Sequence, residues 1–89
     1  MSTYEIVDAT DRGRFELRRD DELLSHADYH VTPEAIVIDH VETELIHRDN
    51  GHAARLMEAI IEIGAERELE LVPVCSYAVG YLRDRERRP

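Results

Sequence analysis

The sequence contains no lysine and no tryptophan, a single cysteine and no long apolar run. One thiol, Cys75, excludes an internal disulfide and a cysteine-rich zinc site, because both need further cysteines. No stretch approaches the roughly 20 apolar residues of a membrane span. The first residues show neither the basic nor the apolar region of a secretion signal. We therefore expect a cytoplasmic protein with no membrane partner.

The length of 89 residues predicts one small domain over residues 1–89. A chain of this size buries only about 60% of the surface that its unfolded form exposes, so its core is thin. Hydrophobic residues make up 43% of the chain, which is too many for a disordered protein. The sequence can therefore form one sheet and a few helices.

The charge balance is strongly acidic. There are 20 acidic residues against 11 basic ones, all of them arginine, and the formal net charge is −9. This charge repels the phosphates of nucleic acids and argues against DNA or RNA as the main partner. It can attract a small-molecule amine or a basic peptide, or it can reflect only the amino-acid usage of the source, with adaptation to salt.

Alternation of apolar and polar residues predicts four strands in the first half of the chain. We expect them at Tyr4–Ala9, Arg14–Arg18, Leu23–Thr32 and Ala35–Thr43, joined by short turns. The alternation in the third strand separates two sets of side chains. It predicts one face with Leu23, Ser25, Ala27, Tyr29 and Val31, and the other with His26, Asp28 and His30.

The period changes in the second half. From Gly51 onward the apolar residues recur at spacings of three and four, which predicts an amphipathic helix that ends near Arg67. Its apolar face is expected to hold Ala53, Leu56, Met57, Ile60, Ile61 and Gly64. A buried strand is expected at Glu70–Val74 and a second helix at Ser76–Arg83, followed by a frayed tail. The order β-β-β-β-α-β-α predicts an α+β domain, an antiparallel meander whose fourth strand lies parallel to the fifth.

The segment His47–Ala54 joins the most β-prone strand to this helix. The first N–H groups of a helix are unpaired and carry about half a positive charge, so phosphate oxygens bind there readily. Gly51 and Ala53 are small enough to admit a phosphate, and Arg48 and Arg55 could bind it directly. The same residues also fit a plain helix start, in which the residues before Gly51 cap the helix.

Two motifs in this part of the sequence resemble the GNAT superfamily of N-acetyltransferases. Residues 48–53, Arg-Asp-Asn-Gly-His-Ala, match its R/Q-x-x-G-x-G/A signature. Residues 72–81, VPVCSYAVGY, resemble the closing motif of its miniature YjdJ-type branch, in which a proline, a cysteine and two tyrosines recur in register. The resemblance covers about residues 4–84. His52 and Ala53 stand where the family usually has a second glycine or small pair, and Leu45-Ile46 stands where it has Val-Pro.

This resemblance implies a protein that binds acetyl-coenzyme A and transfers its acetyl group to an amine. The coenzyme pyrophosphate would lie on the glycine turn, and the pantetheine arm would enter between the fourth and fifth strands. The implied coenzyme-binding residues are Val41, Thr43, Arg48, Asn50, Gly51, His52, Ala53, Ala54, Cys75 and Tyr81.

Cys75 and His40 are the candidate catalytic residues that follow from the same resemblance. The thiol of Cys75 could attack the thioester to give an acetyl-cysteine, with His40 as the base. Cys75 is also consistent with a small buried residue beside the coenzyme sulfur, and His40 with an ordinary histidine on a sheet face. Tyr81 fits a general acid, a coenzyme contact or a packing residue, and Tyr77 is expected to be structural.

Two alternatives remain open at this point. The first places His26, His30 and His40 on one sheet face, where they could bind zinc or copper or line an acceptor groove. Nothing in the sequence locks the register, and no metal site is predicted. A non-catalytic coenzyme A sensor or partner module is the second function, because the miniature branch lacks the two N-terminal helices that build much of the acceptor site. The acceptor and the oligomeric state stay undetermined, although an exposed strand edge could pair with a second copy.

Overall fold

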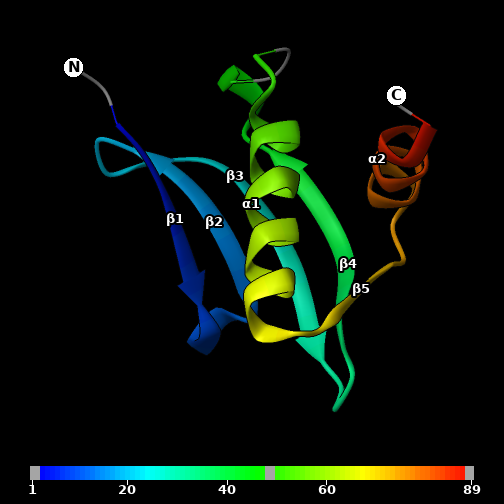
Figure 1. Ribbon diagram of the computed structural model, residues 1–89. Helices are drawn as coiled ribbons and strands as arrows, with labels where there is room; N and C mark the ends of the chain where they lie inside the picture. Colours follow the sequence, from blue (N-terminus) through cyan, green and yellow to red (C-terminus); the bar gives the residue numbers. More distant parts are fainter. Residues whose placement is uncertain (1–2, 48–49, 88–89) are drawn as a thin grey trace.

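A meander of antiparallel strands forms most of the sheet (Figure 1). The computed structural model describes residues 3–47 and 50–87. The strands are β1 (Tyr4–Ala9), β2 (Arg14–Arg19), β3 (Glu22–Val31), β4 (Ala35–Thr43) and β5 (Glu70–Pro73), and they lie side by side in that order. The first four pair antiparallel, and β5 pairs parallel to β4. The helices are α1 (His52–Arg67) and α2 (Ser76–Arg87), so the predicted order and the parallel pair are confirmed.

Helix α1 lies across one face of the sheet and closes the core (Figure 1). Its buried residues include Leu56, Met57, Ile60 and Gly64, as the spacing predicts. Ile61 is only half-buried, and Ile63 packs against the core in addition. The core consists of Phe15, Leu17, Leu24, Ala27, Ile36, Ile38, Leu56, Met57, Ile60 and Ala78.

A β-bulge corrects the predicted face of β3. Leu17 pairs with Ser25 and Arg18 with Leu23, so Leu24 is an extra residue between two pairs. An extra residue reverses the alternation on one side of the bulge. Leu24 is therefore fully buried and Leu23 only half-buried, and the prediction that Leu23 shares the inward face is wrong.

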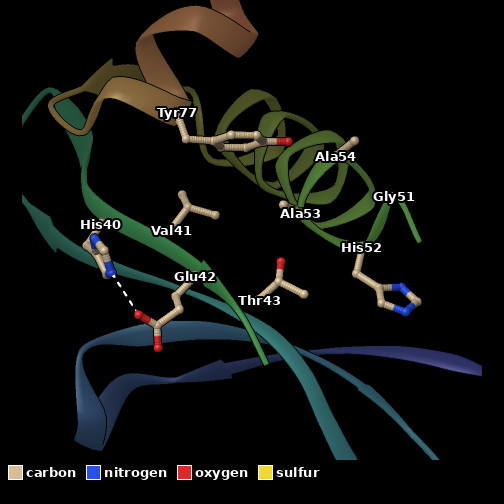
Figure 2. Close-up of a pocket in the computed structure, with 9 residues that line it drawn as sticks. All are labelled: His40, Val41, Glu42, Thr43, Gly51, His52, Ala53, Ala54 and Tyr77. Atoms are coloured by element: carbon tan, nitrogen blue, oxygen red, sulfur yellow. Dashed lines mark hydrogen bonds and ion pairs between the residues drawn. The ribbon is translucent and has the colours of Figure 1, made fainter. Parts of the chain in front are cut away.

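A second bulge falls in β4. Asp28 pairs with His40 and Tyr29 with Ile38, which leaves Asp39 as the extra residue. Because of it, Ile38 and Val41 share the helix-facing side although they are three residues apart. The side chains of His40 and Glu42 then point to the opposite side of the strand (Figure 2).

The C-terminal elements differ from the prediction in two respects. β5 is an edge strand rather than a buried one, and Val72 remains 39% exposed. Pro73 ends it, as expected of a residue that cannot donate to a ladder. The predicted fraying from Arg85 is wrong for residues 85–87, because α2 continues to Arg87 and Arg85 Nε donates to Glu58 on α1 at 2.9 Å. Neither of the described helices is long and apolar enough to cross a membrane.

Candidate functional site

β4 is accompanied by β5 along only its first half. The two strands pair from Ala35 to Ile38, and Val74 N then donates to Ile38 O at 2.9 Å. Beyond this bond the chain turns away into α2, while β4 continues to Thr43. Among the strands that the structure describes, none pairs with this edge of β4 after Ile38. Backbone N–H and C=O groups that point to this edge therefore face a groove and need another partner.

A cavity of about 400 Å³ occupies the space where β4 and α2 diverge. It is lined by His40, Val41, Glu42 and Thr43 of β4, Gly51, His52, Ala53 and Ala54 at the start of α1, and Tyr77 of α2. Figure 2 shows Val41 and Thr43 on the side of β4 that faces α1 and Tyr77. The cavity thus joins an open strand edge to the first turn of a helix.

A second pocket of about 440 Å³ adjoins the first at the same turn. Its lining residues are Asn50, Gly51, Ala54, Arg55, Glu58 and Tyr81. Gly51 and Ala54 line both pockets, so the two pockets share the first turn of α1 as a wall.

Gly51 shapes this turn. It is the N-cap residue of α1 and has φ +74°, the left-handed conformation that side chains rarely adopt. A Cβ placed on it would meet no atom within 4 Å, so its missing side chain leaves open space in front of the helix. As a glycine, Gly51 has no side chain of its own that could accept an N–H group of the first turn.

The two predicted catalytic residues are not brought into hydrogen-bond contact. His40 Nε2 lies 3.3 Å from Glu42 Oε1, and both side chains are about half exposed (Figure 2). Cys75 directly precedes α2, and its Sγ accepts a hydrogen bond from Ala78 N at 3.4 Å. Cys75 is half-buried against the core and lines neither pocket.

A hydrogen-bonded network of side chains borders the second pocket. Tyr81 Oη donates to the Glu58 carboxylate, which also accepts from Arg85 Nε at 2.9 Å and from Arg85 Nη2 at 3.3 Å. The network joins α1 to α2 across the pocket. It fixes the phenol of Tyr81 and pairs the charge of Glu58.

Tyr77 is a lining residue that sequence reasoning assigned to structure alone. Its ring borders the first cavity and lies 6.1 Å from the ring of Tyr81, one helical turn later. Burial raises the pKa of Tyr77, and the neighbouring Cys75 raises it further, so the phenol stays protonated at neutral pH. The i, i+4 spacing of two aromatic residues just after the proline is the signal that could have pointed to it.

Most of the predicted coenzyme-binding residues are brought together by the fold. The residues that line one or both pockets are Val41, Thr43, Asn50, Gly51, His52, Ala53, Ala54 and Tyr81. Arg48 lies outside the described residues, and Cys75 stands apart as described above.

The histidines do not form a metal cluster in this register. His26 stands opposite Glu42, and His40 opposite Asp28. His30 Nδ1 lies 2.8 Å from Asp39 Oδ2. Within residues 3–47 and 50–87, no group of three His, Cys, Asp or Glu side chains is placed to hold a metal ion.

Comparisons with known proteins agree with this geometry. Residues 14–88 match a family model described as GCN5-related N-acetyl-transferase. The fold is similar to the crystal structure of a ribosomal-protein-alanine N-acetyltransferase from Brucella melitensis biovar Abortus 2308, with a TM-score of 0.61 and 25% sequence identity. The similarity covers 67% of this chain and 48% of that one, so it spans about half the length of the enzyme. No curated protein matches the sequence significantly.

Proposed function

This chain belongs to the family of GCN5-related N-acetyltransferases, and from that membership we propose that it binds acetyl-coenzyme A in the joined pockets and transfers the acetyl group to an amine. The observation that carries the proposal is the groove along the edge of β4 that β5 leaves unpaired. This groove ends at Gly51, where a side chain is missing.

The shape of the groove fits the parts of the coenzyme in order. The diphosphate suits the first turn of α1, where N–H groups and the helix dipole favour negative charge. The pantetheine arm carries amide groups, which suit the free edge of β4 as an added strand would. The thioester then lies towards His40, Val41 and Tyr77, at the other end of the first cavity.

Acetyl transfer needs a base that takes a proton from the attacking amine. His40 is our candidate, and Glu42 Oε1, 3.3 Å from His40 Nε2, would hold its ring in place. In the route through Cys75, His40 takes the thiol proton as the sulfur attacks the thioester carbonyl, and the coenzyme leaves and takes up this proton as a free thiol. The amine then attacks the acetyl-cysteine, and its proton passes through His40 to the departing sulfur, which restores the thiol of Cys75.

The acceptor is proposed to be a cationic amine, either a small molecule or a basic peptide. The net charge of −9 favours such a substrate. The structurally similar enzyme acts, by its name, on a ribosomal protein. A peptide amine is therefore the first acceptor to try.

One observation favours the second candidate function, a coenzyme A sensor or partner module without turnover. Cys75 lines neither pocket, and its sulfur is engaged with Ala78 N rather than with His40. Direct transfer does not need Cys75, whereas the covalent route requires its sulfur to reach the thioester.

Two measurements separate these functions. Calorimetry with acetyl-coenzyme A tests binding, and thioester consumption with polyamines, amino acids and basic peptides tests turnover. Intact mass after incubation with acetyl-coenzyme A, in the native chain and in Cys75→Ala, tests the acetyl-cysteine. Turnover with any amine supports the transferase; binding without thioester loss supports the sensor; no binding at millimolar concentration contradicts both.

A further inference from the structure

Arg19 and Arg55 differ from most arginines of this acidic chain. Five described arginines form ion pairs: Arg12, Arg14 and Arg18 with Glu16, Arg67 with Asp8, and Arg85 with Glu58. Arg19 and Arg55 have no carboxylate within ion-pair distance in the part of the chain that the structure describes. Both instead contact the ring of Tyr4, with Arg55 Cζ at 3.9 Å and Arg19 Cζ at 5.4 Å from its centroid.

The ring of Tyr4 holds this pair of cations beside the first turn of α1. Arg19 Nη1 also donates to Tyr4 Oη at 3.3 Å. The ring of Tyr4 lies 5.9 Å from the ring of His52, the first residue of α1, and Tyr4 packs against the core. A guanidinium over an aromatic face is attracted to it, and the contact limits the directions that a long side chain can take. Arg55 is thus restrained although its side chain is exposed.

Arg55 also lines the second pocket. It stands four residues after Gly51, hence about one turn along the same side of the helix. The carboxylate in that pocket, Glu58, is held by Tyr81 and Arg85. Arg55 therefore presents a positive charge to the pocket without a carboxylate partner of its own.

Two like charges held near one ring repel each other, and an anion bound close to them would offset this cost. The ligand of the proposed function carries two separate anionic groups, a diphosphate and a 3′-phosphate on the adjoining ribose. The diphosphate suits the N–H groups of the first turn, so a second phosphate comes within reach of a cation one turn further along.

We propose that Arg55, held against Tyr4 and supported by the charge of Arg19, binds the 3′-phosphate of coenzyme A and selects it over the 3′-dephospho form. This inference rests on the proposed function, since it assigns a second part of the same ligand. Guanidinium groups suit phosphate because they donate two parallel hydrogen bonds.

The test is calorimetry with coenzyme A and 3′-dephospho-coenzyme A on the native chain, Arg55→Gln and Arg19→Gln. The native chain is expected to bind coenzyme A about tenfold more tightly than 3′-dephospho-coenzyme A, because one charge-assisted hydrogen bond contributes about this much. Arg55→Gln should lose this preference and leave the affinity for the dephospho form unchanged. Arg19→Gln should reduce the preference by a smaller factor.

Arg83→Gln is the matched control. Arg83 is an exposed arginine that also lacks a carboxylate partner within the described residues, but it lines neither pocket. Its replacement removes the same charge and should keep the preference of the native chain. Circular dichroism of each variant verifies that the fold is retained.

The outcomes separate this inference from the function on which it rests. The 3′-phosphate site is overturned if the native chain binds coenzyme A and its 3′-dephospho form with equal affinity. It is also overturned if Arg55→Gln loses the same factor of affinity for both ligands. Both results leave the coenzyme function intact. An effect of Arg83→Gln as large as that of Arg55→Gln also overturns it, because net charge would then explain the preference. No binding of either ligand refutes the proposed function itself.

Discussion

At the scale of single residues, Gly51 has the largest expected effect on binding. Its φ of +74° costs little for glycine and about 1 kcal/mol or more for a residue with a Cβ. The open space in front of it is the room that the proposed diphosphate needs. Its role is thus conformational and steric at once, and the two contributions can be separated.

We expect Gly51→Ala to bind acetyl-coenzyme A about tenfold more weakly, a loss of ~1.4 kcal/mol, because its methyl group enters the phosphate space. Gly13→Ala is the control, since Gly13 also has a positive φ, +64°, and lies at a turn outside both pockets. Both variants should lose similar stability in urea, and only Gly51→Ala should lose affinity in calorimetry. Equal affinities in the two variants would mean that the turn does not contact the ligand.

Glu16 is the other residue with a distinct environment. It is 4% exposed and is surrounded by Arg12, Arg14 and Arg18 on one face of the sheet. Burial by itself raises the pKa of Glu16, but hydrogen bonds and charge from Arg14 and Arg18 outweigh it and hold the pKa below its ordinary value.

A carboxylate whose pKa is lower in the folded protein than in the unfolded chain stabilises the fold at pH values above its pKa in the unfolded chain. This stabilisation is lost as the pH falls through its pKa in the folded protein. We expect Glu16→Gln to be less stable at pH 7 by about 2 kcal/mol, because the hydrogen bonds from the arginines lose their charged acceptor. The difference from the native chain should narrow as pH falls below 4. Urea denaturation at several pH values measures this, with exposed Glu62 changed to Gln as a control that should follow the native chain. A constant difference across the series would show that the charge of Glu16 is not what stabilises the cluster.

At the scale of elements, the close approach of α1 to β5 depends on Gly64. A Cβ on Gly64 would lie 3.1 Å from Leu71 Cδ2 and 3.2 Å from Leu69 O. The helix ends there, since Leu69 N donates to Gly64 O at 2.9 Å and Glu68 adopts φ +58° as the C-cap. This capping turn leads α1 directly into β5, so its backbone has little freedom to move.

Gly64→Ala is expected to destabilise the domain by about 1–3 kcal/mol, although alanine is the better helix former, because the added methyl overpacks the turn. Gly80→Ala in α2 is the matched control. The nearest atom to a Cβ on Gly80 is Arg83 Nη2 at 4.0 Å, so this variant should gain about 0.5–1 kcal/mol. Thermal unfolding of the two variants should shift Tm in opposite directions. A higher Tm in both variants would indicate that β5 can move away from α1 at little cost in free energy.

At the scale of the whole molecule, the net charge of −9 acts against the compact state. Ion pairs such as those of Glu16 and Asp8 offset this repulsion locally. The proposed ligand is also anionic, so its site must present positive potential against the field of the protein. The first turn of α1 and the Arg19–Tyr4–Arg55 cluster are the places where the described residues do so.

At 0.1 M salt, the repulsion between exposed charges more than about 10 Å apart is largely screened. Close ion pairs are screened less. We therefore expect Tm to rise by several degrees between about 0.02 and 0.3 M NaCl in the absence of ligand. Scanning calorimetry at pH 7 measures the change, and an uncharged osmolyte at equal osmolality serves as the control. A fall in Tm with salt would show that local ion pairs contribute more than the net charge.

The order of elements and the glycine turn could be predicted from the sequence because both are local signals. The period-two alternation of a strand, the spacing of three and four in a helix, and the point where one period gives way to the other can all be read from consecutive residues. The proposed phosphate site depends on Gly51 and on the helix that follows it, which are neighbours in the chain. The fold class and the α1 face were therefore accessible without coordinates, whereas most of the lining residues were implied only by the family resemblance.

Other features depend on residues that are distant in the sequence. The bulges at Leu24 and Asp39 arise from pairing with β2 and β3, so period-two alternation alone assigned Leu23 to the wrong face. Tyr77 lines the cavity only because β4 and α2 diverge after Ile38.

The sequence by itself determined which segments are strands and helices and where the backbone lacks a side chain, since these follow from periodicity and residue type. Only the tertiary structure decided along which edge of β4 no described strand pairs beyond Ile38, that Cys75 and His40 bond to other partners, and that Arg19 and Arg55 meet on Tyr4. The physical reason is that register, divergence of strands and side-chain neighbours are set by packing between segments far apart in the chain, and no local pattern records them.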